Sequence, residues 1–155
     1  MKFVGILKKL KHAEVGLTIT STDDNISRYF EKFAPSASQR LEALKKLNQE
    51  GIKTYAFFGP LLPHFVASKK EIEKVLKAIR ETGTKRLFVE HINLSQYIKE
   101  RMLKEIKEVD KEFLKKFYSS QSKNYREELN KTIIELVKKY DFELLSDIIY
   151  HKEKK

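Results

Sequence analysis

Cysteine is absent from this sequence of 155 residues. Without it, the chain has no disulfides, no thiolate nucleophile and no thiolate ligands for zinc or an iron–sulfur cluster. Long apolar runs are also missing, since no stretch approaches the roughly 18 apolar residues that a membrane-spanning helix needs. Residues 1–12 show apolar residues at helical spacing with lysines between them, unlike the continuous core of a signal peptide. We therefore expect a soluble, cytoplasmic protein with no membrane partner.

Arginine is scarce relative to lysine, with six arginines among 32 basic residues. The formal net charge of +10 invites a nucleic-acid interpretation. The charge is spread along the chain without a block of one sign, however, and proteins that bind phosphates and grooves favour the fixed fork of arginine. A surface rich in lysine and glutamate also suits a thermophilic protein. Nucleic-acid binding therefore stays an alternative and not the leading interpretation.

Short strand-like segments alternate with amphipathic helical patterns, which is typical of an α/β protein with a parallel sheet. The second strand is expected to stop at Gly59-Pro60, because proline cannot donate to a strand ladder. Capping boxes at Ser36 and Ser68 begin the two intervening helices. The expected strands are Glu14–Ser21, the run Thr54–Pro63 with its break at Gly59-Pro60, and Arg86–Ile92.

The C-terminal part is predicted to be mainly helical. Apolar residues from Ile98 to Phe117 recur every three or four positions, a second helix covers Leu129–Tyr140, and Phe142–Tyr150 is either helix or a last strand. Three parallel strands cannot close a barrel and leave two unpaired edges. Either the C-terminal helices cover an edge, the chain dimerises through it, or the chain is the second half of a larger sheet.

The carboxyl ends of parallel strands are where a ligand site is expected. Thr18 and Thr20 point to one face and can hydrogen-bond ribose or amino acid groups. Arg40 offers a bidentate clamp for a carboxylate. Each residue also has a plain structural interpretation, because threonine is common in strands and Arg40 can form a surface ion pair with Glu31. The residues alone leave both interpretations open.

Two further strand ends carry candidate residues. Residues 59–64 follow the second strand, and Glu90 and His91 end the third. Glu and His suit an acid–base pair, but neighbours on a strand face opposite sides, so one of the two is expected in the cleft. The other histidines show no ligand spacing, and we assign no metal. Phe57 and Phe58 are interpreted as core residues, in preference to a platform for nucleic-acid bases.

Three stretches follow one another in this chain: Val15–Asp23, Glu31–Pro35 with Arg40, and Gly59–Pro63. In this order they resemble the back half of radical S-adenosylmethionine proteins of the spore photoproduct lyase-related, DNA repair photolyase-like group. The resemblance covers residues 10–95, and its order and spacing are more specific than any single motif. The chain departs from the pattern at Lys32, His64 and Ala67.

The resemblance implies a fold and a cofactor. The fold is α/β, a partial parallel (β/α) barrel of about three parallel strands with flanking helices and C-terminal helices. Residues 1–95 would form the half-barrel, and residues 96–155 a helical extension packed on the same domain. The cofactor is S-adenosylmethionine. The family also carries a 4Fe-4S cluster, which this chain cannot bind because its cysteine-rich half is missing.

The resemblance also implies a set of binding residues and a partner. No catalytic residue is assigned, and whether the chain is an enzyme stays open, since alone it is expected to be inert. A separate N-terminal half would supply the cysteines and the missing strands. The alternatives are a basic nucleic-acid-binding module and a homo-oligomer that associates through the exposed sheet edge. The cofactor-binding residues are Thr18, Thr20, Glu31, Arg40, Gly59 and Pro60.

Overall fold

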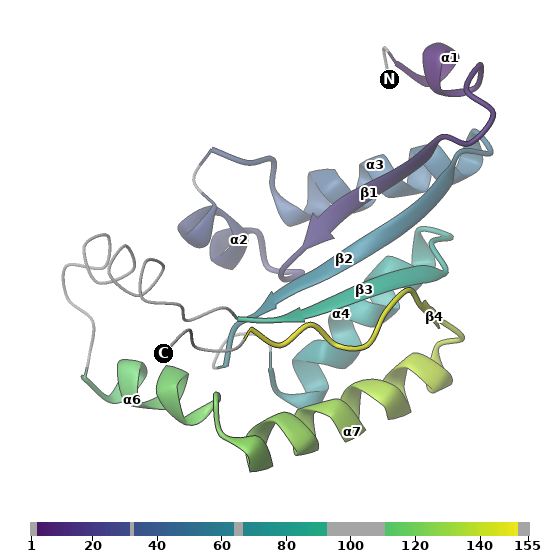
Figure 1. Ribbon diagram of the computed structural model, residues 1–155. Helices are drawn as coiled ribbons and strands as arrows, with labels where there is room; N and C mark the ends of the chain where they lie inside the picture. Colours follow the sequence, from purple (N-terminus) through teal and green to yellow (C-terminus); the bar gives the residue numbers. More distant parts are fainter. Residues whose placement is uncertain (1–2, 32, 64–66, 93–110, 152–155) are drawn as a thin grey trace.

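The structure is a computed structural model that describes residues 3–31, 33–63, 67–92 and 111–151. Helices and strands alternate along the chain, as the sequence predicts (Figure 1). The predicted helix over Ile98–Phe117 lies mostly outside the described residues, and α6 is its described end. The elements are α1 (Val4–Leu7), β1 (Glu14–Ile19), α2 (Asp24–Phe30), α3 (Ala37–Gln49), β2 (Lys53–Leu61), α4 (Lys69–Glu81), β3 (Arg86–His91), α6 (Lys111–Ser119), α7 (Lys123–Lys139) and β4 (Glu143–Leu144).

Four parallel strands form one sheet in the order β1-β2-β3-β4. Each strand therefore lies beside the next strand in the chain, with helices in the connections. The register pairs Thr18 with Phe57 and Phe57 with Phe88, so these three side chains form one row across the sheet. The predicted α/β class and the parallel pairing of the three predicted strands are confirmed.

The helices cover one face of the sheet. Phe58, Leu87 and Val89 are fully buried and join the core with apolar residues of α3, α4 and α7. The residues that alternate with these buried ones along β2 and β3 point to the other face and are only half-buried. Figure 1 shows α3 and α4 behind the strands and no described helix in front of them. The other face is called the open face below, and its residues are Gly16, Thr18, Tyr55, Phe57, Arg86, Phe88 and Glu90.

The segment Phe142–Tyr150 supplies a fourth strand, which settles the choice between helix and strand. Glu143 and Leu144 pair with β3, and Ile149 makes a further parallel bridge to Glu90. The expected number of about three strands is therefore too low. The sequence pattern gave a weak signal because only two residues form the regular ladder and bends separate them from the bridge.

The prediction that the second strand stops at Gly59-Pro60 is wrong, because β2 continues to Leu61. The pairing with β3 shifts register between Phe58 and Leu61. Pro60 lies inside this irregularity, where a strand tolerates a residue without an N–H donor. The peptide bond between Gly59 and Pro60 is cis.

The predicted helix starts are confirmed by their caps. Ser36 and Gln39 form the predicted reciprocal capping box at the start of α3. At the start of α4 one half of the predicted box is present, the hydrogen bond from the Glu71 amide to the Ser68 hydroxyl. After these helices the chain turns through Gly51 at φ +74° and the equivalent glycine at position 83, as expected for C-terminal glycines.

A buried polar network ties the amino end of the sheet to the helices. Asn48 Nδ2 donates to the Thr82 carbonyl and to the Thr84 hydroxyl, each at 3.1 Å. Asn48 Oδ1 accepts from the Thr54 hydroxyl at 2.9 Å. One amide side chain thus joins the end of α3, the start of β2 and the loop before β3. Because Thr54 and Thr84 are buried, the network is expected to stabilise the fold strongly.

We predict that Asn48→Ala lowers the free energy of unfolding by about 2–3 kcal/mol, because it removes the hydrogen bonds between the Asn48 amide and the Thr54 hydroxyl, the Thr84 hydroxyl and the Thr82 carbonyl. The measurement is urea unfolding followed by circular dichroism. Gln49→Ala is the matched control, since Gln49 is the next residue of α3 and is exposed. Equal unfolding midpoints for the two variants would contradict the prediction.

Candidate functional site

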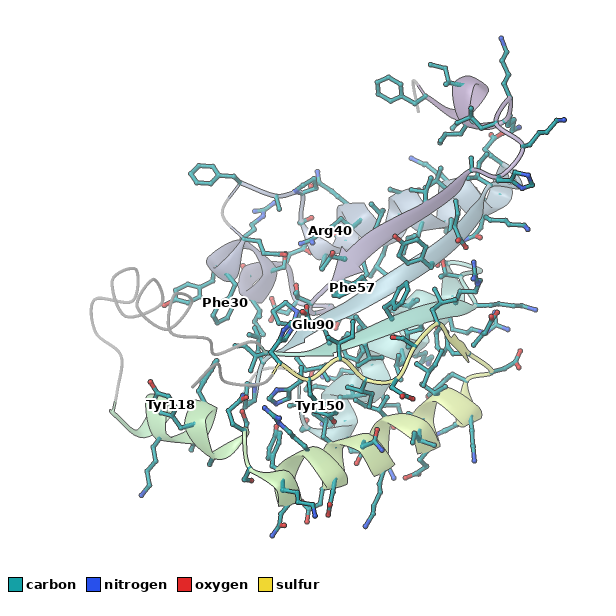
Figure 2. All side chains as sticks on the ribbon, in the orientation of Figure 1. Phe30, Arg40, Phe57, Glu90, Tyr118 and Tyr150 are labelled. Carbon is teal, nitrogen blue, oxygen red and sulfur yellow. The ribbon has the colours of Figure 1, made fainter. Side chains whose placement is uncertain are left out.

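Four of the predicted binding residues meet beyond the carboxyl end of β1. Arg40 Nη1 donates to the Thr18 carbonyl at 3.0 Å. Arg40 Nη2 forms an ion pair with the Glu31 carboxylate, which also accepts from the Thr20 hydroxyl at 3.4 Å. Figure 2 shows Arg40 beside β1. Thr18, Thr20, Glu31 and Arg40 are called the carboxyl-edge cluster below.

Local contacts between α2 and α3 explain why Glu31 and Arg40 face each other. Asp24 accepts from the Ser38 amide at 2.9 Å and from the Ser38 hydroxyl at 2.6 Å. These hydrogen bonds from Ser38 lower the pKa of Asp24, which keeps the carboxylate available as an acceptor. The Ser27 hydroxyl accepts from the first amide of α3 at 3.2 Å. The two helices are therefore fixed together, with Glu31 at the end of α2.

Arg40 is the buried member of the Arg40–Glu31 pair, and Glu31 is the partly exposed one. Arg40 is 8% exposed, and its Nε has no hydrogen-bond partner among the described residues. In this structure the guanidinium clamps a carboxylate of the chain itself. The Glu31 side chain is 25% exposed, so solvent or a ligand reaches the carboxylate. A fixed carboxylate beside the Thr20 hydroxyl suits a ligand with hydroxyl or ammonium donors.

Gly59 and Pro60 lie at the end of β2, between the carboxyl-edge cluster on β1 and Glu90 on β3. A Cβ atom on Gly59 would lie 2.9 Å from both the Cβ and the carbonyl oxygen of Glu90. This spacing is too short for a side chain, so glycine permits the close approach of the two strands. The structure thus places Gly59 against Glu90, beside the predicted ligand edge.

Aromatic side chains line the open face below this edge. The Phe88 ring packs against Tyr55 at 5.5 Å and against Phe57 at 6.0 Å between centroids. The Tyr55 ring covers Gly16, where a Cβ atom would clash with it. Of the two phenylalanines that the sequence assigns to the core, Phe58 is fully buried, whereas Phe57 is half-buried on the open face (Figure 2).

Glu90 and His91 face opposite sides of the sheet, as predicted. Glu90 is half-buried on the open face and His91 is fully buried on the helix side. Glu90 Oε1 lies 2.6 Å from His151 Nε2, a pair that sequence reasoning missed. The two residues are 61 positions apart and meet because Ile149 bridges to Glu90 after β4. The one related signal in the sequence is the possible strand over Phe142–Tyr150, which directly precedes His151.

His91 lies in a buried cluster with aromatic neighbours. Its ring packs against Tyr125 and Tyr150, and Nε2 has no hydrogen-bond partner among the described residues. Burial, assisted by the nearby Arg126 charge, lowers the pKa of His91 from 6.5 to about 4. His91 is therefore neutral in the folded protein near neutral pH. It belongs to the buried helix side of the sheet and does not line the open face.

Several expectations concern residues outside the described part of the chain, namely Lys32, His64 and most of Ile98–Phe117. Within residues 3–31, 33–63, 67–92 and 111–151, no three side chains of His, Cys, Asp or Glu come together as a metal site would require. No helix in the same ranges is both long and apolar enough to cross a membrane.

Comparison with known proteins gives one partial match to report. The uncharacterized protein MJ0683 of Methanocaldococcus jannaschii is 39% identical to this chain over 66 residues. The matched stretch covers 43% of this chain and 26% of that protein, so it spans about a quarter of the relative's length. No protein-family model and no solved structure matches the chain. These comparisons identify a distant relative, and they assign no activity to this chain.

We predict that the stability of the fold falls as the pH drops from 7 to 4, in part because of His91. The folded pKa of about 4 lies below the unfolded value of 6.5. Protonation therefore favours the unfolded chain, and the loss develops as the pH falls below 6.5 and ends near pH 4. It amounts to roughly 3 to 4 kcal/mol at most, because one pKa unit is worth about 1.4 kcal/mol.

The check is urea unfolding at several pH values for the parent protein and for His91→Phe, which cannot titrate. We expect a smaller slope of stability against pH for His91→Phe, whatever its absolute stability. His12→Gln is the control, because His12 is exposed. An unchanged slope in His91→Phe would show that His91 does not cause the acid loss.

Proposed function

We propose that this chain forms one wall of an S-adenosylmethionine-binding cleft, equivalent to the C-terminal half of a radical S-adenosylmethionine protein of the spore photoproduct lyase-related group. The carboxyl-edge cluster carries the proposal. The sequence resemblance singles out Thr18, Thr20, Glu31 and Arg40 separately, and hydrogen bonds and an ion pair join these residues. They lie at the edge of a parallel sheet where ligands bind.

The sheet architecture supports the same proposal. Four parallel strands in chain order, with helices on one face, suit half of a (β/α) barrel. All-parallel sheets normally have both faces covered. The half-buried aromatic residues of the open face would then line the barrel interior. A complete cleft would need a second polypeptide segment opposite this wall.

The residues of the wall have distinct proposed roles. The Glu31 carboxylate and the Thr20 hydroxyl would bind donor groups of the ligand, such as ribose hydroxyls or the ammonium. Arg40 would act behind them as a positioning residue, because its guanidinium already binds Glu31 and the Thr18 carbonyl. Gly59 would let the adenosine part approach the backbone of β2, since it has no side chain.

The iron–sulfur cluster of the family does not fit this chain. Such clusters are held mainly by cysteine thiolates, and the 155 residues contain no cysteine. We therefore propose no radical step for the isolated chain. Its own part is to bind and orient the ligand, and cleavage would depend on a second polypeptide that supplies the thiolates and the opposite wall.

Isothermal titration with S-adenosylmethionine tests the proposal. We expect weak binding, with a dissociation constant of about 1 mM, because half of the usual contacts are missing. Thr20→Val and Glu31→Gln should each weaken binding about 5- to 10-fold through the loss of one hydrogen bond. Glu135→Gln is the control, since Glu135 pairs with Lys69 on the exposed surface of α7.

A second arm adds iron and sulfide to the protein under anaerobic conditions and looks for cleavage of S-adenosylmethionine. We expect none, since no thiolate is present to hold a cluster. Turnover by the chain alone would contradict the proposal. Binding that is absent, or that is equally strong in Thr20→Val, Glu31→Gln and Glu135→Gln, would show that the carboxyl-edge cluster is not the ligand wall.

A further inference from the structure

One edge of the sheet carries apolar surface that nothing in the described chain covers. Each of β2, β3 and β4 follows a helix with several buried residues, but α1, which precedes β1, has no buried residue. Phe3, Ile6 and Leu10 are 64%, 59% and 57% exposed. Figure 1 shows α1 standing away from α3 and α4. A helix in this position normally packs between its own strand and a preceding strand, and here β1 is the outermost strand.

The opposite edge has a groove that is open to an apolar side chain. A pocket of about 510 Å³ lies between α7 and the segment that follows β4. Ile134, Leu144 and Ile148 contribute to its lining, and Ile134 is 39% exposed. Leu144 is half-buried and Ile148 is buried, so Ile134 is the exposed member of these three. An exposed apolar residue at the rim of a groove suits an interaction surface. The groove lies at the β4 edge, so the chain carries an uncovered helix at one edge and a groove at the other.

We propose that two copies of this chain associate head to tail, with β1 of each copy beside the β4 segment of the other. Four parallel strands from each copy would give eight, the number at which a parallel barrel closes with an interior filled by side chains. A two-fold axis along the barrel keeps all strands parallel and makes both junctions identical. Closure also removes both unpaired edges.

The two edges can run side by side over part of their length. β1 has six residues, whereas the β4 edge pairs regularly with β3 at Glu143 and Leu144 and, after bends, again at Ile149 opposite Glu90. The apolar residues of α1 would enter the groove beside Ile134. The groove lining carries two basic residues, Lys123 and Arg126, and two acidic residues, Glu127 and Asp147. These charges balance, so the contact is argued from the apolar residues and not from charge.

The open face gives a further reason for closure. Tyr55, Phe57 and Phe88 are half-buried there and pack on one another without a covering layer in the described residues. In the dimer these rings would face the rings of the second copy across the barrel axis. Their burial would add to the two edge junctions, because removing apolar surface from water is the main favourable term in association.

The dimer is independent of the cofactor proposal, because it is argued from edges, groove and open face alone. It also has a consequence for that proposal. A cluster-binding half would need the same β1 edge and the same open face, so self-association and binding of such a half exclude one another. The dimer would be the form of the chain when no other polypeptide covers these surfaces.

Sedimentation equilibrium over a wide range of protein concentrations tests the dimer. Two variants each remove one side of the junction: Ile6→Ser with Leu10→Ser on α1, and Ile134→Lys in the groove. All three positions are exposed in the described chain, so the fold should survive, which circular dichroism checks. We expect a dimer for the parent protein and at least a 10-fold weaker dimer for each variant. Tyr29→Ser is the control, since Tyr29 is 60% exposed on α2 and belongs neither to α1 nor to the groove lining.

Mixing the two variants gives the sharpest result. In a head-to-tail dimer, the intact α1 of one variant meets the intact groove of the other, so the mixture should form more dimer than either variant alone. Hydrogen exchange should also show that the outward amides of β1 are protected in the dimer and exposed in the variants. A monomer at every concentration, a dimer unaffected by both variants, or a mixture with no recovery would each overturn the proposal.

The outcomes also separate this proposal from the cofactor proposal. Calorimetry with S-adenosylmethionine tests ligand binding at the carboxyl-edge cluster, whereas sedimentation tests association through the sheet edges. Loss of dimer with intact ligand binding would reject only the association. Loss of ligand binding in Glu31→Gln with an intact dimer would leave the association in place.

Discussion

The structure depends on one constraint: a parallel strand needs hydrogen-bonded neighbours on both edges and cover on both faces. The described chain meets this need only in part. Helices α3, α4 and α7 bury one face, and β2 and β3 have neighbours on both sides. In the described chain the open face and the exposed residues of α1 have no cover, and the outer edge of β1 has no neighbouring strand. These three features support the proposal that a further polypeptide completes the sheet.

The two ends of the sheet differ in their side-chain contacts. At the amino end, Asn48 and its threonine partners form a buried network in which the amide side chain is shared by three segments. At the carboxyl end, Glu31 and Thr20 are held by Arg40 but remain within reach of a ligand. With the proposed ligand edge at the carboxyl end, the sheet would follow the division that is general in barrels of alternating strands and helices, with stability at one end and chemistry at the other.

The sequence predicted the parts of the fold that local chemistry determines. Capping residues such as Ser36 and Ser68 placed helix starts correctly, because a cap acts within one turn. The contacts that it missed are long-range. The pairing of His151 with Glu90 depends on a strand of two residues, too short to show a period of two. The burial of Arg40 likewise follows from the packing of α2 on α3 and from no local pattern.

The central claim is that the carboxyl-edge cluster is the ligand wall of an incomplete barrel. Amide chemical-shift mapping by NMR during a titration with S-adenosylhomocysteine, the unreactive analogue, tests it most directly. The account predicts that the largest shifts fall on Thr20, Glu31 and Gly59, across the ends of β1, α2 and β2. Shifts confined to the groove beside Ile134, or no shifts at saturating ligand, would contradict it.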